Sequence, residues 1–434
     1  MRERRLPRRR RALAILESRS NNGTTAVMAW RIPELGGSAT QVLPLNVIDT
    51  HAAVASTSSY VPEVDALRGL AMSAVVAFHC KLLPCGWMGV WLFFVVSGFS
   101  VTTSMLAGQR RAASVGAGIW HFYVRRAARI WPLYFAFLGL NVIALVALRK
   151  FGPLEELPSL LSFTYNFKMT FTDYTPDIDW PAFGHLWTLA VEQQFYLVFP
   201  LLMLVSRAVQ IRILLGMILA APLIRAAVAA WATTLGWDPG RIAFAVYAFA
   251  PGHFDAFAAG TLIALFRTEI AGNRRLPYRA MIVAAGVAAI HISVYATIGV
   301  LRVGHFSPEA MRNIVSGIAY GQGREISVYL IPTAIGSAML IGILARERFC
   351  LWLCRMPALQ AIGRISYGGY LFHVPALMVV NIGLAMIFVQ PTGTVAAMGH
   401  IALFVCGFPL AVATAWLSFT YFEQRFLRIR AQYR

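Results

Sequence analysis

An arginine and a histidine stand out in the first strongly apolar stretch of the chain, EVDALRGLAMSAVVAFHC. Arg68 and His79 are eleven residues apart, and no ionisable residue lies between them. Ionisable side chains at membrane depth cost about 2.5–3.5 kcal/mol each, so they persist mainly where they are paired or line a watery cavity. The two residues are about 16 Å apart along a helix. The spacing predicts Arg68 near one membrane face and His79 at or beyond the bilayer centre.

Two later apolar segments place ionisable residues at similar depths. FGHLWTLAVEQQFYL contains His185 near the outer entrance of a span and Glu192 seven residues later, on the same helical face and about 10 Å deeper. ISYGGYLFHVP places His373 nine residues beyond Arg364, about 14 Å from the inner face. A carboxylate beside an imidazole would make a competent general base. We therefore predict a site for acyl transfer or proton relay from His79, Glu192 and His373.

A cluster of arginines enters the third apolar segment in FYVRRAARIWPLY. Arg126 and Arg129 are three residues apart and are therefore neighbours on one helical face, directly after Arg125. Forked guanidinium groups suit a phosphate-rich ligand. The alternative interpretation is an orientation signal that binds lipid phosphates. We predict that Arg125, Arg126 and Arg129 bind the cofactor together with Arg68.

The composition is that of a membrane protein. Of the 434 residues, 58% are hydrophobic and 13% are charged, whereas soluble domains carry about 25% charged residues. Apolar runs of about 17–25 residues can cross a bilayer. We expect an all-α, polytopic bundle of about ten transmembrane helices, near residues 64–82, 87–106, 130–148, 186–205, 211–230, 243–266, 280–300, 326–345, 363–388 and 397–421.

The basic residues between these spans indicate the orientation. With the N-terminus inside, nineteen arginines fall in inside segments and eight basic residues fall outside. Cytoplasmic loops carry an excess of Lys and Arg, so we predict that both termini are cytoplasmic and that the chain lies in the inner (plasma) membrane. The net charge of +19 does not indicate nucleic-acid binding, because the charges lie in short loops and not on one soluble face.

The two ends of the chain differ from the apolar part. Residues 1–60 begin MRERRLPRRRR and show no sustained apolar period, so we expect a disordered, basic cytoplasmic extension. A transmembrane domain over residues 61–428 and a basic cytoplasmic tail over residues 429–434 follow. Cys350 and Cys354 lack the histidines that a zinc site would need, and we expect no metal.

Ser97 lies in the second apolar segment, WMGVWLFFVVSGFSVTTSML, between Gly89 and Gly98. Small residues such as these permit close helix approach. Ser97 is a possible nucleophile, but nothing in its motif supplies a base. We therefore predict a packing role for it.

Six motifs occur in order along the chain: VDALRGLAMSAVVAFH, GVWLFFVVSGFSVT, RRAARIWPLY, HLWTLAVEQQFYL, ISYGGYLFHVP and SFTYFEQRF. Together they resemble the acyltransferase-3 family of integral-membrane acyltransferases, from about residue 61 to residue 428. The resemblance implies transfer of an acyl group, commonly acetyl, from cytoplasmic acyl-CoA to a hydroxyl of a carbohydrate or glycan acceptor on the outer side. It implies that His79 is the catalytic histidine, that Arg68 is its partner in the motif, and that Arg126 and Arg129 serve the CoA phosphates.

The fourth motif departs from the family pattern. Glu192 matches its acidic position, but Thr188 replaces a frequent Ser and Gln193 replaces a frequent second Glu. These departures weaken any scheme that needs two adjacent carboxylates. The segment PGHFDAFAAG, with His253 and Asp255, is a looser match. For substrate-binding or supporting roles we predict Asp65, His185, Asp255 and His373.

Other functions remain open from the sequence. The first alternative is a proton-coupled transporter or exporter of a polar small molecule or glycan precursor, in which His79, Glu192 and His373 relay protons. A membrane-bound O-acyltransferase of the other, His-and-Asn type and a non-enzymatic scaffold are further alternatives. For an acyltransferase, direct attack on the thioester and a transient acyl-histidine are both open. The sequence does not identify the acceptor, the acyl chain or the oligomeric state.

Overall fold

The computed structural model describes residues 16–20, 23–27, 61–109, 112–172, 180–318, 320–386 and 393–432. The chain divides into two units, Met1–Thr57 and Ser58–Arg434. In the first unit, strands β1 (Leu16–Ser20) and β2 (Gly23–Val27) pair antiparallel. Because the rest of that unit lies outside the described residues, the expected disorder of residues 1–60 stays a prediction.

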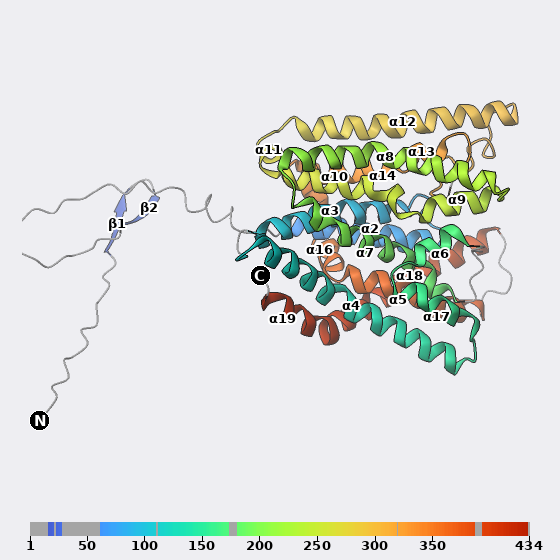
Figure 1. Ribbon diagram of the computed structural model, residues 1–434, viewed down its shortest axis with the longest axis horizontal. Coiled ribbons are helices and arrows are strands. Elements are labelled where there is room, and N and C mark those ends of the chain that lie inside the picture. The colour runs from blue at the N-terminus through green and yellow to red at the C-terminus, as the bar shows by residue number, and fades with distance from the viewer. Residues whose placement is uncertain are drawn as a thin grey trace, which may run out of the picture. The chain divides into compact units, whose positions relative to one another are not determined.

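The second unit is a bundle of helices that run roughly along one common direction (Figure 1). Its longer helices are α2 (Pro62–His79), α3 (Met88–Gln109), α4 (Val115–Ala147), α7 (Trp187–Leu202), α8 (Arg207–Thr234), α9 (Pro239–Ala248), α10 (Phe254–Leu265), α12 (Leu276–Val303), α14 (Leu330–Leu344), α17 (Ser366–Ala385) and α18 (Gly393–Ser418). Shorter helices connect them, namely α5 (Leu157–Leu161), α6 (Tyr165–Phe171), α11 (Arg267–Ala271), α13 (Arg324–Ser327), α15 (Arg348–Cys354) and α16 (Pro357–Arg364), and α19 (Gln424–Gln432) follows α18. The predicted all-α polytopic fold is confirmed for this unit.

Seven single helices in the described part of the chain are long and apolar enough to cross a membrane, and the bent pair α9–α10 brings the number to eight. Each of the ten predicted spans overlaps a helix or this pair. Two of the ten predicted spans correspond to helices outside this set of eight. One is α2, which carries Glu63, Asp65 and Arg68 within 18 residues, and the other is α7, which has only 16 residues. The chain is a multi-pass membrane protein, and the count of ten spans stays a prediction.

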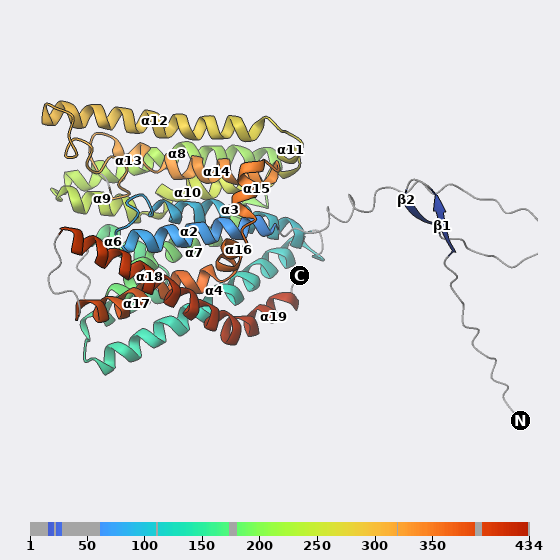
Figure 2. The ribbon, with the colours of Figure 1, turned by 180° about the vertical axis from the view of Figure 1, so that it is seen from behind.

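The helices α2 and α7, which are not long or apolar enough to cross a membrane by themselves, lie inside the bundle. Figures 1 and 2 show α2, α3 and α7 in the middle, with α12 along one edge and α4 and α19 along the other. Burial agrees, because 61% of the apolar window of α3 is buried but only 17% of that of α12. Helices enclosed by protein need not be apolar throughout, since they do not face lipid.

Glycines allow the central helices to touch. A Cβ on Gly98 of α3 would lie 2.1 Å from the Phe257 carbonyl oxygen, and one on Gly260 of α10 would lie 1.9 Å from the Val95 carbonyl oxygen. Gly363 of α16 approaches Asp65 of α2 equally closely. The expected packing role of Gly98 is confirmed, and these contacts pack α3 closely against α10 and α2 closely against α16.

Candidate active site

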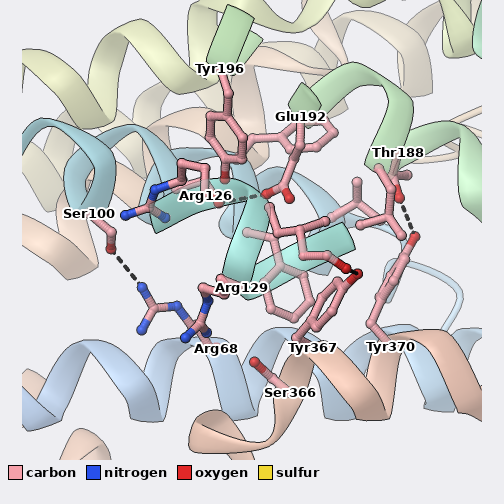
Figure 3. A pocket seen from close by; sticks show the side chains of 16 residues that line it. Arg68, Ser100, Arg126, Arg129, Thr188, Glu192, Tyr196, Ser366, Tyr367 and Tyr370 are labelled. Carbon is pink, nitrogen blue, oxygen red and sulfur yellow. Dashed lines mark hydrogen bonds between the residues drawn. The ribbon is translucent and has the colours of Figure 1, made fainter. Parts of the chain in front are cut away.

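A cavity of about 80 Å³ lies among α2, α3, α4, α7 and α17. Its polar lining consists of Arg68, Ser97, Ser100, Arg126, Arg129, Thr188, Glu192, Tyr196, Ser366, Tyr367 and Tyr370. Figure 3 shows the three arginines gathered at one side and Thr188 with Tyr370 at the other. We refer to this space as the arginine cavity.

Arg68 is held in place from two sides. It forms an ion pair with Asp65, one helical turn earlier, and donates to the Ser100 Oγ at 2.6 Å. The expected supporting residue Asp65 is thus the direct partner of Arg68. Two fixed partners leave the guanidinium pre-oriented at the cavity wall.

Arg126 and Arg129 line the same cavity, as expected for residues three apart on one face of α4. The Arg126 guanidinium lies 5.8 Å from the ring centre of Phe122 and 5.7 Å from that of Tyr196. Its Nε is buried and has no hydrogen-bond partner among the described residues. Arg126 therefore has donor capacity that a ligand could use.

Arg125, which we expected at the cofactor site, is placed elsewhere. It is buried but does not line the arginine cavity. Its guanidinium packs against the last turn of α3, where a Cβ on Gly108 would lie 2.7 Å from its Nη2. Arg125 shares a helical face with Arg129, four residues later, but it lies one turn nearer the start of α4, beside the end of α3.

Glu192 lies in the arginine cavity and not beside His79. Its Oε1 accepts a hydrogen bond from Ser97 Oγ at 2.6 Å, and its charged neighbours are Arg68, Arg126 and Arg129. The expected pairing of this carboxylate with the His79 imidazole is therefore not seen. Ser97 was missed as a site residue, because the carboxylate that it contacts comes from α7 and not from its own motif.

Three histidines from separate segments meet beyond the cavity. The ring centre of His373 is 5.1 Å from that of His79 and 4.9 Å from that of His185. His373 is fully buried and His185 nearly so, whereas His79, the last residue of α2, is exposed. We refer to these three residues as the histidine cluster.

The tautomer of His373 follows from its contacts. Its Nδ1 lies 2.6 Å from the Tyr370 carbonyl oxygen, which can only accept, so Nδ1 carries the proton. In the neutral ring Nε2 then holds a lone pair, and this atom is buried without a hydrogen-bond partner among the described residues. His373 thus offers a free acceptor within the histidine cluster.

Thr188 and Tyr370 separate the arginine cavity from the histidine cluster. Their hydroxyl oxygens are 2.7 Å apart, and the Tyr370 hydroxyl donates to the His185 carbonyl oxygen at 3.2 Å. The Tyr370 ring lies 5.4 Å from the rings of both His185 and His373. An open passage from the arginines to His79 is therefore interrupted by this pair in the present conformation.

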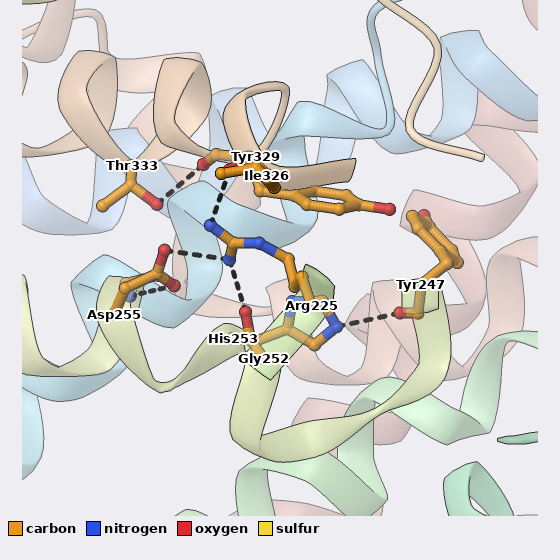
Figure 4. A network of polar contacts seen from close by, with 9 residues as sticks. Arg225, Tyr247, Gly252, His253, Asp255, Ile326, Tyr329 and Thr333 are labelled. Carbon is orange, nitrogen blue, oxygen red and sulfur yellow. Dashed lines mark hydrogen bonds and ion pairs between the residues drawn. The ribbon is translucent and has the colours of Figure 1, made fainter. Parts of the chain in front are cut away.

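Asp255 supports the fold and does not line the arginine cavity. It pairs with Arg225 of α8 at 3.1 Å, and both side chains are fully buried (Figure 4). Arg225 also donates to the carbonyl oxygens of Gly252 at 2.5 Å and Ile326 at 3.1 Å. These contacts hold the 71° bend between α9 and α10. The segment PGHFDAFAAG, which matched the family pattern less closely, thus forms the bend between α9 and α10.

The site can hold an anion and move a proton. Three guanidinium groups face one lining carboxylate, so the arginine cavity carries an excess of positive charge. Among the residues that the structure describes, no group of three or more His, Cys, Asp or Glu side chains is arranged to hold a metal ion. The chemistry of these residues is that of anion binding and acid–base transfer.

Comparison with known proteins identifies the family. A family described as acyltransferase domain matches residues 61–420. The chain is 28% identical to the peptidoglycan O-acetyltransferase OatA of Listeria monocytogenes, over 73% of this chain and 49% of the relative. It is 30% identical to the O-acetyltransferase OatA of Staphylococcus aureus strain NCTC 8325, over 33% of this chain and 24% of the relative.

The aligned region spans about half the length of the Listeria relative. No solved structure matches the chain. The family match covers most of the chain and all six ordered motifs begin within it. The chain belongs to the acyltransferase-3 family.

Proposed function

We propose that this protein transfers an acetyl group from acyl-CoA at the cytoplasmic face of the inner membrane to a hydroxyl of a cell-wall carbohydrate on the outer side. One observation carries the proposal: a cavity with three arginines lies directly behind a cluster of three histidines, within the central helices. The names of the OatA relatives support acetyl as the group and peptidoglycan as the acceptor class. Both termini are cytoplasmic in this proposal.

The donor binds through its phosphates. Arg68, Arg126 and Arg129 supply forked, permanently charged donors that match phosphate oxygens. From there to His79 the distance along α2 is about 16 Å, and the flexible pantetheine arm of CoA covers such a distance. The thioester passes Thr188 and Tyr370 when their hydrogen bond opens.

His79 is the general base in this scheme. In the proposed reaction the N–H of His79 moves to hydrogen-bond distance of the His373 Nε2, which has no partner among the described residues in the present conformation, and the other nitrogen of His79 is then unprotonated. That nitrogen removes the proton from the acceptor hydroxyl as the oxygen attacks the thioester carbonyl. The C–S bond breaks, and the CoA thiolate takes the proton from the His79 imidazolium.

Transfer to a sugar tests the function directly. The purified full-length chain is incubated with acetyl-CoA carrying a labelled acetyl group and with soluble peptidoglycan fragments, and the sugars are analysed by mass spectrometry. We expect a mass gain of one acetyl group on a hydroxyl. Binding or movement of the sugar without acetylation would favour the transporter alternative.

Opening of the Thr188–Tyr370 pair gives a further prediction. Tyr370→Phe removes the hydrogen bonds to Thr188 and to the His185 carbonyl, each worth about 0.5–1.5 kcal/mol. We expect the open state to be more populated, so that acetyl-CoA hydrolysis without an acceptor rises about three- to tenfold. Released thiol measures this rate. Tyr295→Phe is the control, because the Tyr295 hydroxyl, on α12, donates to the Gln322 carbonyl oxygen and Tyr295 does not line the arginine cavity. Equal hydrolysis rates in the two variants would contradict a gating role for Tyr370.

A further inference from the structure

Residues 345–365 connect two helices that are long and apolar enough to cross a membrane, so this connection lies at a membrane face. The first of these helices ends at Leu344 and the second begins at Ser366. α15 lies within the connection, against α14 and near α11 at one end of the bundle (Figure 2). The connection contains four arginines and a single acidic residue, Glu347. It therefore carries an excess of positive charge at the membrane face.

α15 has a buried side and an exposed side. Cys350, Leu351 and Cys354 are buried. Phe349 and Trp352, three residues apart, are 61% and 64% exposed, and their rings stack with centres 6.2 Å apart. Exposure of two large rings to water is unfavourable, whereas aromatic rings are enriched where membrane and water meet. The exposed side of α15 therefore fits the surface of a bilayer.

A groove of about 460 Å³ lies against this helix. It is lined by Arg348, Leu351, Trp352, Arg355 and Met356. Arg348, Trp352 and Arg355 are four and three residues apart, so they share one helical face with the indole between the two arginines. The long arginine side chains can lie along apolar surface while their charged ends reach a ligand. The groove thus combines two positive charges with an apolar floor.

The two arginines of the groove have one carboxylate between them. The Arg355 Nε lies 3.5 Å from the Glu63 Oε1 of α2. Arg348 is exposed and has no ion-pair partner among the described residues. Its planar guanidinium can donate two parallel hydrogen bonds to a phosphate. The groove therefore has the charge that complements an anion.

We propose that this groove binds the headgroup of an anionic phospholipid, with Arg348 and Arg355 at the phosphate and Trp352 against the apolar part of the lipid. The exposed rings and the place between two membrane spans favour a lipid over a soluble anion. Basic pockets at the ends of membrane helices bind such headgroups. The inference goes beyond the proposed function, because no residue of this groove lines the arginine cavity.

Photolabelling with lipid probes tests the inference. Phosphatidylglycerol with a photoreactive group beside the headgroup, and a matched phosphatidylcholine probe, are titrated into the full-length protein in detergent micelles. Label at residues 348–356 is mapped by mass spectrometry, so other basic surfaces do not contribute. We expect half-saturation with phosphatidylglycerol at an about tenfold lower concentration than with phosphatidylcholine.

Two kinds of variant separate charge from apolar contact. Arg348→Gln should raise the half-saturating concentration of phosphatidylglycerol about fivefold, and Arg348→Gln with Arg355→Gln about 20- to 30-fold. Neither should change the value for phosphatidylcholine by more than about twofold. Trp352→Ala should instead raise both values by the same factor, about three- to tenfold, because the ring contributes apolar contact and no charge.

Arg207→Gln is the control, since Arg207 is exposed, pairs with Glu269 at 3.3 Å and lies outside the groove. It should leave labelling at residues 348–356 unchanged. Equal half-saturation by the two probes in the wild type would overturn the inference, and so would an unchanged phosphatidylglycerol value in the double variant. Displacement of the phosphatidylglycerol probe by acetyl-CoA would assign the groove to a nucleotide and would also overturn it.

Discussion

Replacing His79 with alanine is expected to lower acetyl transfer to a sugar hydroxyl about a thousandfold, because a positioned general base contributes about 10²- to 10⁴-fold. His79 is the exposed member of the histidine cluster, and in the proposed scheme the acceptor reaches it from the outer side. Binding of acetyl-CoA should stay within about twofold of the wild type, since the proposed phosphate site at Arg68 lies about 16 Å away along α2. Initial rates at saturating donor, with the dissociation constant measured separately, check both expectations.

The control for this substitution is His305→Ala, which removes an exposed histidine after α12, outside the cluster. It should transfer acetyl at the wild-type rate. A folded His79→Ala protein that does the same would exclude His79 from the mechanism. A large loss of donor binding in that variant would instead place the thioester end of the donor against His79 in the resting complex.

Replacing Arg126 with glutamine is expected to weaken acetyl-CoA binding about 30- to 100-fold. Hydrogen bonds to charged groups contribute about 1.5–3 kcal/mol each, and the Arg126 Nε has no competing partner among the described residues. The loss should be specific for phosphate. The apparent Michaelis constant for acetyl-CoA should rise, whereas that for S-acetylpantetheine, which lacks the phosphates, should stay within about twofold.

Arg207→Gln is the matched control for Arg126→Gln. Arg207 is exposed and pairs with Glu269 at 3.3 Å, outside the arginine cavity. It should leave the Michaelis constants of both donors unchanged. Equal losses for the two donors in Arg126→Gln would relocate the phosphate site.

The sequence was sufficient for features set by local periodicity. The apolar runs predicted the positions of the helices, and the three-residue spacing predicted that Arg126 and Arg129 share one cavity. Arg125 shares a face with Arg129 but packs against the end of α3 one turn earlier, and the motif alone did not reveal this contact. The length of α7, 16 residues, was also not predicted. An apolar run does not show whether its helix is enclosed by protein, where a shorter helix is sufficient.

Contacts between distant helices were beyond sequence reasoning. Glu192 meets Ser97 from a helix almost a hundred residues away, and Asp255 meets Arg225 across a bend. His79 contacts His373 and not the expected Glu192 carboxylate. Residue spacing along a helix gives the depth of a side chain in the membrane, but not its position in the plane of the membrane. A single sequence shows how deep a residue lies along its helix and which helical face it occupies. It does not show which faces of different helices pack together.

Transfer across a sealed membrane tests the central claim most directly. Proteoliposomes are loaded with soluble peptidoglycan fragments and washed, and acetyl-CoA with a labelled acetyl group is added outside. Protein oriented with its arginine cavity towards the outer solution should place labelled acetyl on the enclosed sugars, and Arg126→Gln should reduce this labelling. Labelling that requires donor and sugar in the same compartment would contradict the account.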